Sequence, residues 1–531
     1  MSNYDSSDPS DNSSVTSGIE SPPQRLSGIL KRLGPGLIVA GSIVGSGELI
    51  ATTKTGAEAG FSLLWLILIG CFIKVFTQIE FGRFTIATGQ TTLAGLNQVP
   101  GPRFRVNWIV WGWLFMTILV LAQQGGIAGG VGQALSISFP LTENGRQFNE
   151  VQDSRVKLKV NQALLQRYQQ ESGENPSTSQ TKQIHHIQSE ITLLEKKLST
   201  FSTSPKSNDD IIWAAIIILF TTGLLWVGKY GFIQTFATVM VASFTAVTLF
   251  TVIRLQRQPD WSINWSQLWE GLRFSLPEPS ADNPSARPLQ TALATFGIIG
   301  VGAAELIMYP YWCLEKGYAR FTGPKEPSDS WMGRARGWMR VMRIDAWCSM
   351  AIYTFATVAF FFLGATVLFR TSLNPEGADL IRTLAEMYVP VFGPKAHSMF
   401  LFGAVAVLYS TLFVALASTA LVASDAVRVF GFRDDSEASK KTWYSRFCLA
   451  FPLIALSMLL MVPKSPEKLV LASGVAQALM LPALGCGALF FRYKKCDPEL
   501  RPGRLWDLFL WLSALGFLVA GAWLAWFKLF S

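Results

Sequence analysis

Eleven long apolar runs decide what this chain can fold into. A helix of roughly 20 apolar residues crosses the hydrocarbon core of a bilayer, and only helices or closed barrels satisfy their backbone polar groups there. We therefore predict an all-α polytopic membrane protein, with membrane lipid as its constant partner. The predicted spans cover residues 34–56, 61–88, 107–140, 210–228, 231–254, 290–314, 343–370, 396–430, 446–462, 466–492 and 504–530.

Composition agrees with this class and excludes others. Half of the 531 residues are hydrophobic and 15% are charged, which is too apolar for a typical soluble protein. The net charge of +9 does not indicate nucleic-acid binding, because the Lys and Arg residues lie between the apolar runs. The six cysteines show neither a disulfide nor a zinc-site spacing, and no catalytic or nucleotide-binding motif is present. The sequence thus predicts neither an enzyme nor a resident cofactor.

The charges of the loops predict an orientation. Loops on one side are rich in Lys and Arg, whereas the loop 371–395 carries Glu376, Asp379 and Glu386 against two basic residues. Basic loops face the cytoplasm. We therefore expect a cytoplasmic N-terminus and an external C-terminus in the cell (inner) membrane, with spans one and six running in opposite directions.

The chain divides into four predicted segments. Residues 1–30 form a polar cytoplasmic tail, predicted to be disordered, and residues 31–140 hold spans one to three. Residues 210–531 hold spans four to eleven. The insertion 141–209 is polar, and a heptad-like seam in it predicts an external, coiled-coil-like helical hairpin that would bind a partner or a second copy. That seam consists of Ile184, Ile187, Ile191, Leu194 and Leu198, with Val160, Leu164 and Tyr168 as the facing stripe.

Two short stretches interrupt spans one and six with small residues followed by a carboxylate. They are Gly45-Ser46-Gly47-Glu48 and Gly302-Ala303-Ala304-Glu305. Small residues invite a helix to break, and a pair of interrupted segments at matching positions of two inverted halves is typical of the midplane site of a secondary transporter. These eight residues are the predicted substrate-binding site.

Glu48 and Glu305 are the candidate metal ligands. An ionised carboxylate in hydrocarbon is costly, so it takes up either a proton or a cation. Backbone carbonyls freed by helix breaks would add hard oxygen ligands. The alternative is a structural glutamate bonded to the backbone or to a buried arginine.

Three further charged residues in the spans are candidates for proton or gating roles. Glu80 and Arg83 stand three residues apart on span two, where they can pair with each other. Asp345 follows Arg343 near the start of span seven, which suits a local ion pair or a gate equally well.

Several motifs resemble the Nramp (natural resistance-associated macrophage protein) family of proton-coupled divalent metal transporters. The resemblance implies a LeuT-type fold, with ten helices in two inverted five-helix repeats and an eleventh helix. The matching motifs are Leu33–Ala40, Ala59–Trp65, Arg83 with Thr88-Gly89, Gly297–Gly300, Arg343–Asp345 and Leu481-Pro482.

The site motifs depart from that family. Its first-span motif is Asp-Pro-Gly-Asn, where this chain has residues 45–48, and its sixth-span motif is Met-Pro-His-Asn, where this chain has residues 302–305. Loss of the thioether and the imidazole favours a hard cation over a thiophilic metal. We therefore expect a transporter that moves a divalent cation by alternating access. The alternatives are a carrier of an amino acid or other small organic solute, and a non-transporting docking protein.

Overall fold

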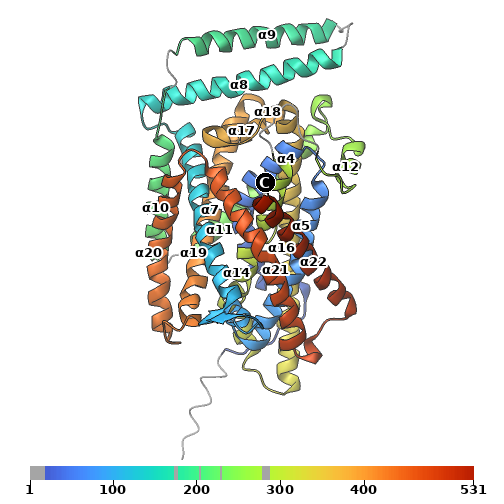
Figure 1. The fold of residues 1–531 in the computed structure, drawn as a ribbon, viewed down its shortest axis with the longest axis vertical. Coiled ribbons are helices and arrows are strands. Elements are labelled where there is room, and N and C mark those ends of the chain that lie inside the picture. Colours follow the sequence, from blue (N-terminus) through green and yellow to red (C-terminus); the bar gives the residue numbers. More distant parts are fainter. Residues whose placement is uncertain (1–17, 173–177, 202–204, 228–229, 278–286, 531) are drawn as a thin grey trace, which may run out of the picture.

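The computed structural model describes residues 18–172, 178–201, 205–227, 230–277 and 287–530. Long helices run side by side through the body of the molecule, and two more helices lie across one end of it (Figure 1). We call this end the hairpin end. Within the described residues, strands occur only as the two-residue pair β1 (Arg103–Phe104) and β2 (Val106–Asn107) at the opposite end.

Eleven helical segments correspond to the predicted spans. Among the described residues, ten are long and apolar enough to cross a membrane, and the apolar part of α11, Val241–Leu255, adds the eleventh. In order they are α3 to α4 (Pro35–Ala59), α5 (Leu64–Thr88), α7 (Trp108–Ser138), α10 (Asp209–Val227), α11 (Tyr230–Leu255), α13 to α14 (Pro288–Glu315), α16 to η4 (Asp329–Thr371), α18 to α19 (Val389–Val429), α20 (Glu437–Met461), α21 to η7 (Pro466–Lys495) and α22 (Arg504–Phe530).

The spans differ in how much of their surface is buried, and short helices connect them. In α10, α20 and α22, about one-third or less of the apolar stretch is buried, so these three helices lie at the periphery. Span six is almost entirely enclosed. The connecting elements are α2 (Leu26–Arg32), α6 (Thr92–Leu96), η2 (Pro259–Trp261), α12 (Trp265–Gly271), α15 (Tyr318–Thr322), η5 (Gly377–Asp379), α17 (Leu380–Glu386), η6 (Gly393–Lys395) and η8 (Pro498–Leu500).

Span one does not break where we predicted. It remains helical from Pro35 to Ala59, but its middle, η1 (Val44–Thr52), is a π-helix between α3 (Pro35–Ile43) and α4 (Thr53–Ala59). The Thr52 hydroxyl donates to the Gly47 carbonyl at 3.0 Å. The Thr53 hydroxyl likewise donates to the Glu48 carbonyl at 3.3 Å. These two hydroxyls therefore occupy carbonyls that an unwound segment would have left free.

Span six breaks as predicted. Helix α13 (Pro288–Ile298) ends before residues 299–302, and α14 (Ala303–Glu315) starts directly after them. Gly300 has a φ of +57°, a left-handed conformation that glycine adopts without strain. The break therefore leaves one helix C-terminus and one helix N-terminus inside the bundle.

Glycines on α7 allow its neighbours to approach closely. A Cβ at Gly125 would overlap the carbonyl oxygen of Ala455 on α20, and one at Gly126 would lie 2.6 Å from the carbonyl oxygen of Pro466 on α21. Small residues at such crossings bring helix backbones together in membranes. This packing holds span three, and the glutamines it carries, against span ten.

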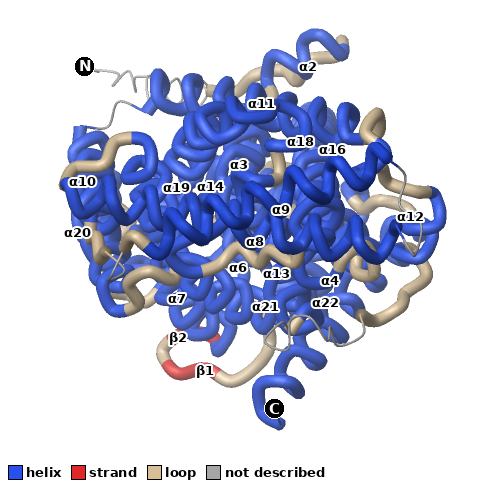
Figure 2. The backbone as a smooth tube through the Cα atoms, turned by 90° about the horizontal axis from the view of Figure 1, so that it is seen from above, coloured by secondary structure: helices blue, strands red, loops and turns tan. Residues whose placement is uncertain are grey.

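The insertion folds as two helices, α8 (Glu143–Ser172) and α9 (Thr178–Ser199), which cross the hairpin end of the bundle (Figure 2). The α9 seam residues are half-buried. In the predicted facing stripe, the Tyr168 hydroxyl donates to Asp260 at 3.1 Å and Val160 packs on the core of the bundle. Helix α8 thus holds the hairpin against the bundle, and Arg382 reinforces this by donating to Asp153 at 2.8 Å.

The prediction of a disordered tail is wrong for residues 18–30, while residues 1–17 lie outside the described residues. Glu20 pairs with Arg32 of α2 at 2.7 Å, and its carbonyl accepts from the Trp338 indole at 3.0 Å. These partners lie far along the chain or on another element, which a composition argument does not reveal. They attach the segment to α16 (Asp329–Leu363), which begins well before the predicted residue 343.

Candidate functional site

The two predicted stretches meet at the break of span six. The π-helical segment of span one lies against the end of α13, because a Cβ at Gly47 would be 3.1 Å from the carbonyl oxygen of Ile298. Glu48 is fully buried, and its Oε1 accepts from the Gly300 amide at 3.4 Å and from the Thr357 hydroxyl at 3.0 Å. One carboxylate thus bridges spans one, six and seven.

The second oxygen of Glu48 has no partner in the described part of the chain. Its Oε2 is buried, and no hydrogen bond from the described residues reaches it. A buried charge without a partner is strongly unfavourable, so this oxygen requires a proton or a cation. Glu305 lies close enough for the two carboxylates to interact electrostatically.

Glu305 lies in the first turn of α14, whose N-cap is Gly302. A Cβ at Gly302 would overlap Glu305 Oε2, so the carboxylate reaches back to the start of its own helix. The positive end of the helix dipole favours an anion there. The half-buried Glu305 and the fully buried Glu48 therefore approach the same break from two different helices.

Lys74 of α5 completes the charged set, and the sequence reasoning missed it. Its side chain is fully buried, and its Nζ donates to the carbonyls of Phe296 and, at 2.8 Å, of Ile299. Its charge interacts with both Glu48 and Glu305. The available signal was a single lysine in the interior of an apolar run, which in a membrane span indicates a functional site.

A network of amides and hydroxyls lines the other side of the break. Gln123 donates to the Ser46 hydroxyl at 2.9 Å, and its Oε1 accepts from Ser473 at 2.7 Å and from Gln477 at 3.0 Å. Gln477 Oε1 in turn accepts from the Ala304 amide at 3.1 Å. The network joins spans one, three, six and ten through neutral groups, so it positions the site without adding charge.

The remaining predicted residues pack the site. A Cβ at Gly45 would overlap the Thr411 hydroxyl of α19, so this glycine permits a helix contact. Ala303 is fully buried at the start of α14. Seven of the predicted residues, from Ser46 to Glu48 and from Gly302 to Glu305, surround the break, and Gly45 faces away toward span eight.

Glu80 and Arg83 lie elsewhere. They form the predicted ion pair, at 3.2 Å, and the Trp506 indole of α22 donates to Glu80 at 2.6 Å. Arg83 also donates to the Leu500 carbonyl at 3.0 Å. These contacts join α5 to the start of span eleven and give the pair a structural setting.

Asp345 joins three elements at the end opposite the hairpin. Its carboxylate accepts from the amides of Gly34 and Gly36 at 2.9 and 2.5 Å, and from the Tyr309 hydroxyl at 3.1 Å. The beginning of span one is therefore held to spans six and seven. Arg343 takes no part in these contacts.

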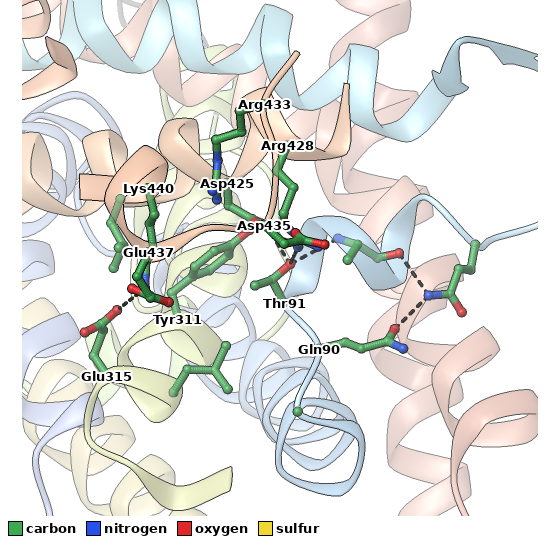
Figure 3. A pocket seen from close by; sticks show the side chains of 15 residues that line it. Gln90, Thr91, Tyr311, Glu315, Asp425, Arg428, Arg433, Asp435, Glu437 and Lys440 are labelled. Atoms are coloured by element: carbon green, nitrogen blue, oxygen red, sulfur yellow. Dashed lines mark hydrogen bonds and ion pairs between the residues drawn. The ribbon is translucent and has the colours of Figure 1, made fainter. Parts of the chain in front are cut away.

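A second polar cluster surrounds a cavity of about 490 Å³ at this same end (Figure 3). Asp425 is its centre, accepting from Thr91 at 2.6 Å, from Tyr311 at 2.7 Å and from Arg428 at 2.7 Å. Because the Asp425 carboxylate is already satisfied by these donors, the cluster holds α6, α14 and α19 together. It does not contain the predicted site residues.

The donor set defines what the break can bind. Among the described residues, no three His, Cys, Asp or Glu side chains converge on one point. A cation beside Glu48 and Glu305 would therefore complete its shell with neutral oxygens such as the Ser46 hydroxyl, or with water. All of these are hard oxygen donors.

Known metal transporters resemble this chain in sequence. The family described as natural resistance-associated macrophage protein-like (Nramp) matches residues 36–144 and 204–527, on both sides of the hairpin. A metal transporter, Nramp6.2, of Populus trichocarpa is 30% identical over 21% of this chain and 19% of its own length. The divalent metal cation transporter MntH of Caldanaerobacter subterraneus is 29% identical over 21% of this chain and 26% of its own. The matched stretch thus spans about a fifth to a quarter of these relatives.

Solved structures agree in fold. A manganese transporter of Eremococcus coleocola superposes with a TM-score of 0.54 at 14% identity, covering 96% of this chain and 89% of that one. MhsT in complex with L-phenylalanine gives 0.51 at 17% identity, covering 95% and 99%. At these identities the likeness concerns the fold alone, and it confirms the predicted LeuT-type arrangement.

Proposed function

The chain belongs to the Nramp-like family, and from that premise we propose that it is a secondary transporter that moves a divalent metal cation across the membrane by alternating access. The curated relatives are described as metal or divalent metal cation transporters, and they match over part of the chain. The fold supports the same activity, because it places a broken helix and two carboxylates inside the bundle.

The observation that carries the proposal is Oε2 of Glu48, which is unpaired among the described residues. It is buried at the break, beside a second carboxylate, and no described donor meets it. A divalent cation between Glu48 and Glu305 would satisfy it with two charged ligands. Because Thr357 and Gly300 already hold the other oxygen of Glu48, binding needs little rearrangement of this side chain.

We propose a hard cation as cargo. The ligand atoms available at the break are carboxylate, hydroxyl and amide oxygens, while the thioether and imidazole of the family's usual motif are absent from positions 302–305. Oxygen sets of this kind suit Mg²⁺, Ca²⁺ and Mn²⁺, whereas thioether and imidazole ligands favour softer transition metals. Proton coupling would require Glu48 or Glu305 to exchange the cation for a proton.

We propose a gating role for Asp345, because its hydrogen bonds hold the start of span one against spans six and seven at the end opposite the hairpin. Opening that end requires span one to separate from spans six and seven, and Asp345 links these three elements. The Glu80–Arg83 pair, by contrast, joins α5 to the start of span eleven, which suits a fixed anchor.

We propose that the N-terminus is cytoplasmic and that the hairpin and the C-terminus are external, in the cell (inner) membrane. The support is the loop charge bias, since Lys316, Arg320, Arg334 and Arg340 lie at the end opposite the hairpin, and basic loops face the cytoplasm. Self-association through the hairpin is not supported, because the α9 seam that would form the interface is already half-buried within the single chain.

The alternative cargo, an amino acid or other organic solute, has less support at this site. Its carboxylate would use the N-terminus of α14, and the Ala304 amide there is already bonded to Gln477. A docking protein without transport would place its function in the hairpin. Both remain as outcomes of the test below.

The test is uptake into vesicles reconstituted with the full chain, with Mg²⁺, Ca²⁺, Mn²⁺ and Fe²⁺ offered separately. We expect uptake of a divalent cation that Glu48→Gln and Glu305→Gln each abolish. Glu467→Gln is the matched control, because Glu467 is also buried and one of its oxygens meets no donor among the described residues. It lies in the first turn of α21, about 15 Å along the helix from Gln477. Undiminished uptake in both site variants would show that the cation passes elsewhere. Stabilisation by organic solutes alone would favour the alternative cargo.

A further inference from the structure

The break of span six exposes two carbonyl oxygens at the end of α13, and a lysine from another span binds both. Phe296 and Ile299 belong to the last turn of α13 and the residue after it, where carbonyls have no partner within the helix. Lys74 Nζ donates to each of them. The negative end of the α13 dipole adds to this attraction.

The setting of these carbonyls is that of a monovalent-cation site. Unwound carbonyls and half-helix C-termini are the groups that coordinate small cations at broken helices. The Phe296 ring contributes as well, since the Lys74 ammonium lies 4.9 Å from its centroid, within the range of a cation–π contact. Any cation placed here would have two oxygens, a ring face and a helix C-terminus around it.

Lys74 differs in this respect from Lys54, the other lysine that is buried among the described residues. Lys54 of span one forms ion pairs with Glu58 at 3.0 Å and with Glu376 at 3.3 Å, an ordinary carboxylate setting. The hydrogen bonds of Lys74 to described residues all go to backbone carbonyls, although its charge interacts with Glu48 and Glu305 at longer range. Backbone carbonyls therefore hold the Lys74 ammonium in the way that they would hold a free monovalent cation.

We propose that Lys74 is a tethered cation: its ammonium permanently fills a monovalent-cation site formed by the Phe296 and Ile299 carbonyls. The carrier therefore needs no alkali cation at the break, and these two carbonyls are not ligands of the cargo. The inference rests on the proposed function and deepens it by setting the charge beside the cargo site, where the Lys74 ammonium offsets one of the two negative charges that Glu48 and Glu305 carry when both are ionised. The tethered-cation site itself does not depend on which cargo is carried.

The experiment is chemical rescue, read as the melting temperature of the purified full chain. Lys74→Ala removes the ammonium and leaves a cavity beside both carbonyls. We expect this variant to melt well below wild type, and methylammonium, ammonium or an alkali cation to raise its melting temperature by several degrees. Choline, which is too bulky, should have no such effect, and wild type should respond to none of these cations.

Gln78→Ala is the matched control. Gln78 lies one turn further along α5, is fully buried, and has no partner for either amide atom among the described residues. Its removal leaves a cavity of similar size that does not include the Phe296–Ile299 cation site. A rise with methylammonium in both variants would reveal a general salt effect and overturn the proposal.

A second variant guards against misfolding. Lys74→Met keeps the length of the side chain and leaves room only for a bare alkali cation at its tip. If neither variant gains stability from any of these cations, or if neither accumulates as folded protein even when prepared in methylammonium, the proposal is contradicted. Because the readout is stability, it is separate from uptake: failure of the Glu48 and Glu305 variants to reduce uptake would refute the cargo site and leave this result standing.

Discussion

The Thr357 hydroxyl donates to Oε1 of Glu48 at 3.0 Å, while no donor among the described residues meets Oε2. Span seven thereby orients a carboxylate that span one carries, and the free oxygen is left for a ligand. The amide of Gly300 approaches the same Oε1 from the break of span six. Three spans therefore determine where one carboxylate lies.

Thr357→Val should weaken cation binding without unfolding the protein. The substitution keeps the shape of the side chain but removes the donor that orients Glu48, and loss of an outer-shell partner typically costs about 10- to 100-fold in metal affinity. Isothermal titration of the purified chain measures this. Thr366→Val on the same span is the control, since the buried Thr366 hydroxyl has no partner among the residues that the structure describes and its loss should leave affinity unchanged.

Gly45→Ala should destabilise the fold, whereas Gly41→Ala should not. A Cβ at Gly45 would overlap the Thr411 side chain, and overpacking of this kind costs about 1–3 kcal/mol. A Cβ at Gly41, one turn earlier on the same helix, would meet no atom within 4 Å, so alanine there should gain roughly 0.5–1 kcal/mol. Melting temperatures of the two variants give the comparison. Equal stability would mean that span one does not approach span eight this closely.

Asp345→Ala should open the end opposite the hairpin. The change releases the Gly34 and Gly36 amides and the Tyr309 hydroxyl, so span one is no longer held to spans six and seven. Cys313 is buried on α14 beside this contact, and its thiol should then react faster with a small maleimide in a chain whose other cysteines are replaced.

The control for this labelling is Glu386→Gln at the hairpin end, where Glu386 contacts His397 at 3.0 Å. It should leave the reaction of Cys313 unchanged. An Asp345→Ala variant that reacts no faster than the parent would indicate that Asp345 is a structural cap for span one and does not control access.

Deletion of residues 143–208 should leave uptake within a few-fold of wild type. The chain can close across the gap, because Asp209 accepts hydrogen bonds from the amides of Leu141 and Thr142 at 2.7 and 3.0 Å. Arg382 would lose Asp153, so we expect a melting temperature a few degrees lower. Uptake measured beside a pull-down decides the matter: intact uptake supports a transporter, and loss of a bound partner with no uptake in either protein supports a docking role.

The sequence was sufficient for the spans and for the meeting of the two interrupted stretches. Apolar length sets a membrane span by itself, and inverted repeats bring equivalent segments together, so Glu48 and Glu305 could be paired before any coordinates were known. The local ion pairs Glu80–Arg83 and Asp425–Arg428 were also predictable, because residues three apart share a helix face.

Contacts between distant segments were not predictable. The expected break of span one is a π-helix, whose carbonyls at Gly47 and Glu48 are met by threonines five residues on. The carbonyls at the break of span six are met by Lys74, which lies 222 residues from Phe296. Residue spacing predicts neither set of hydrogen bonds, because it does not show which side chain will donate to a given backbone carbonyl.

The most direct test of the central claim is a structure of the full chain soaked in Mn²⁺ as an anomalous marker, with Mg²⁺ added in competition. We predict one peak at about 2.0–2.2 Å from Glu48 Oε2 and a Glu305 oxygen, weakened by Mg²⁺, with Lys74 still on its two carbonyls. A peak in the Asp425 cavity, or one at the Phe296 and Ile299 carbonyls with Lys74 displaced, would contradict the account.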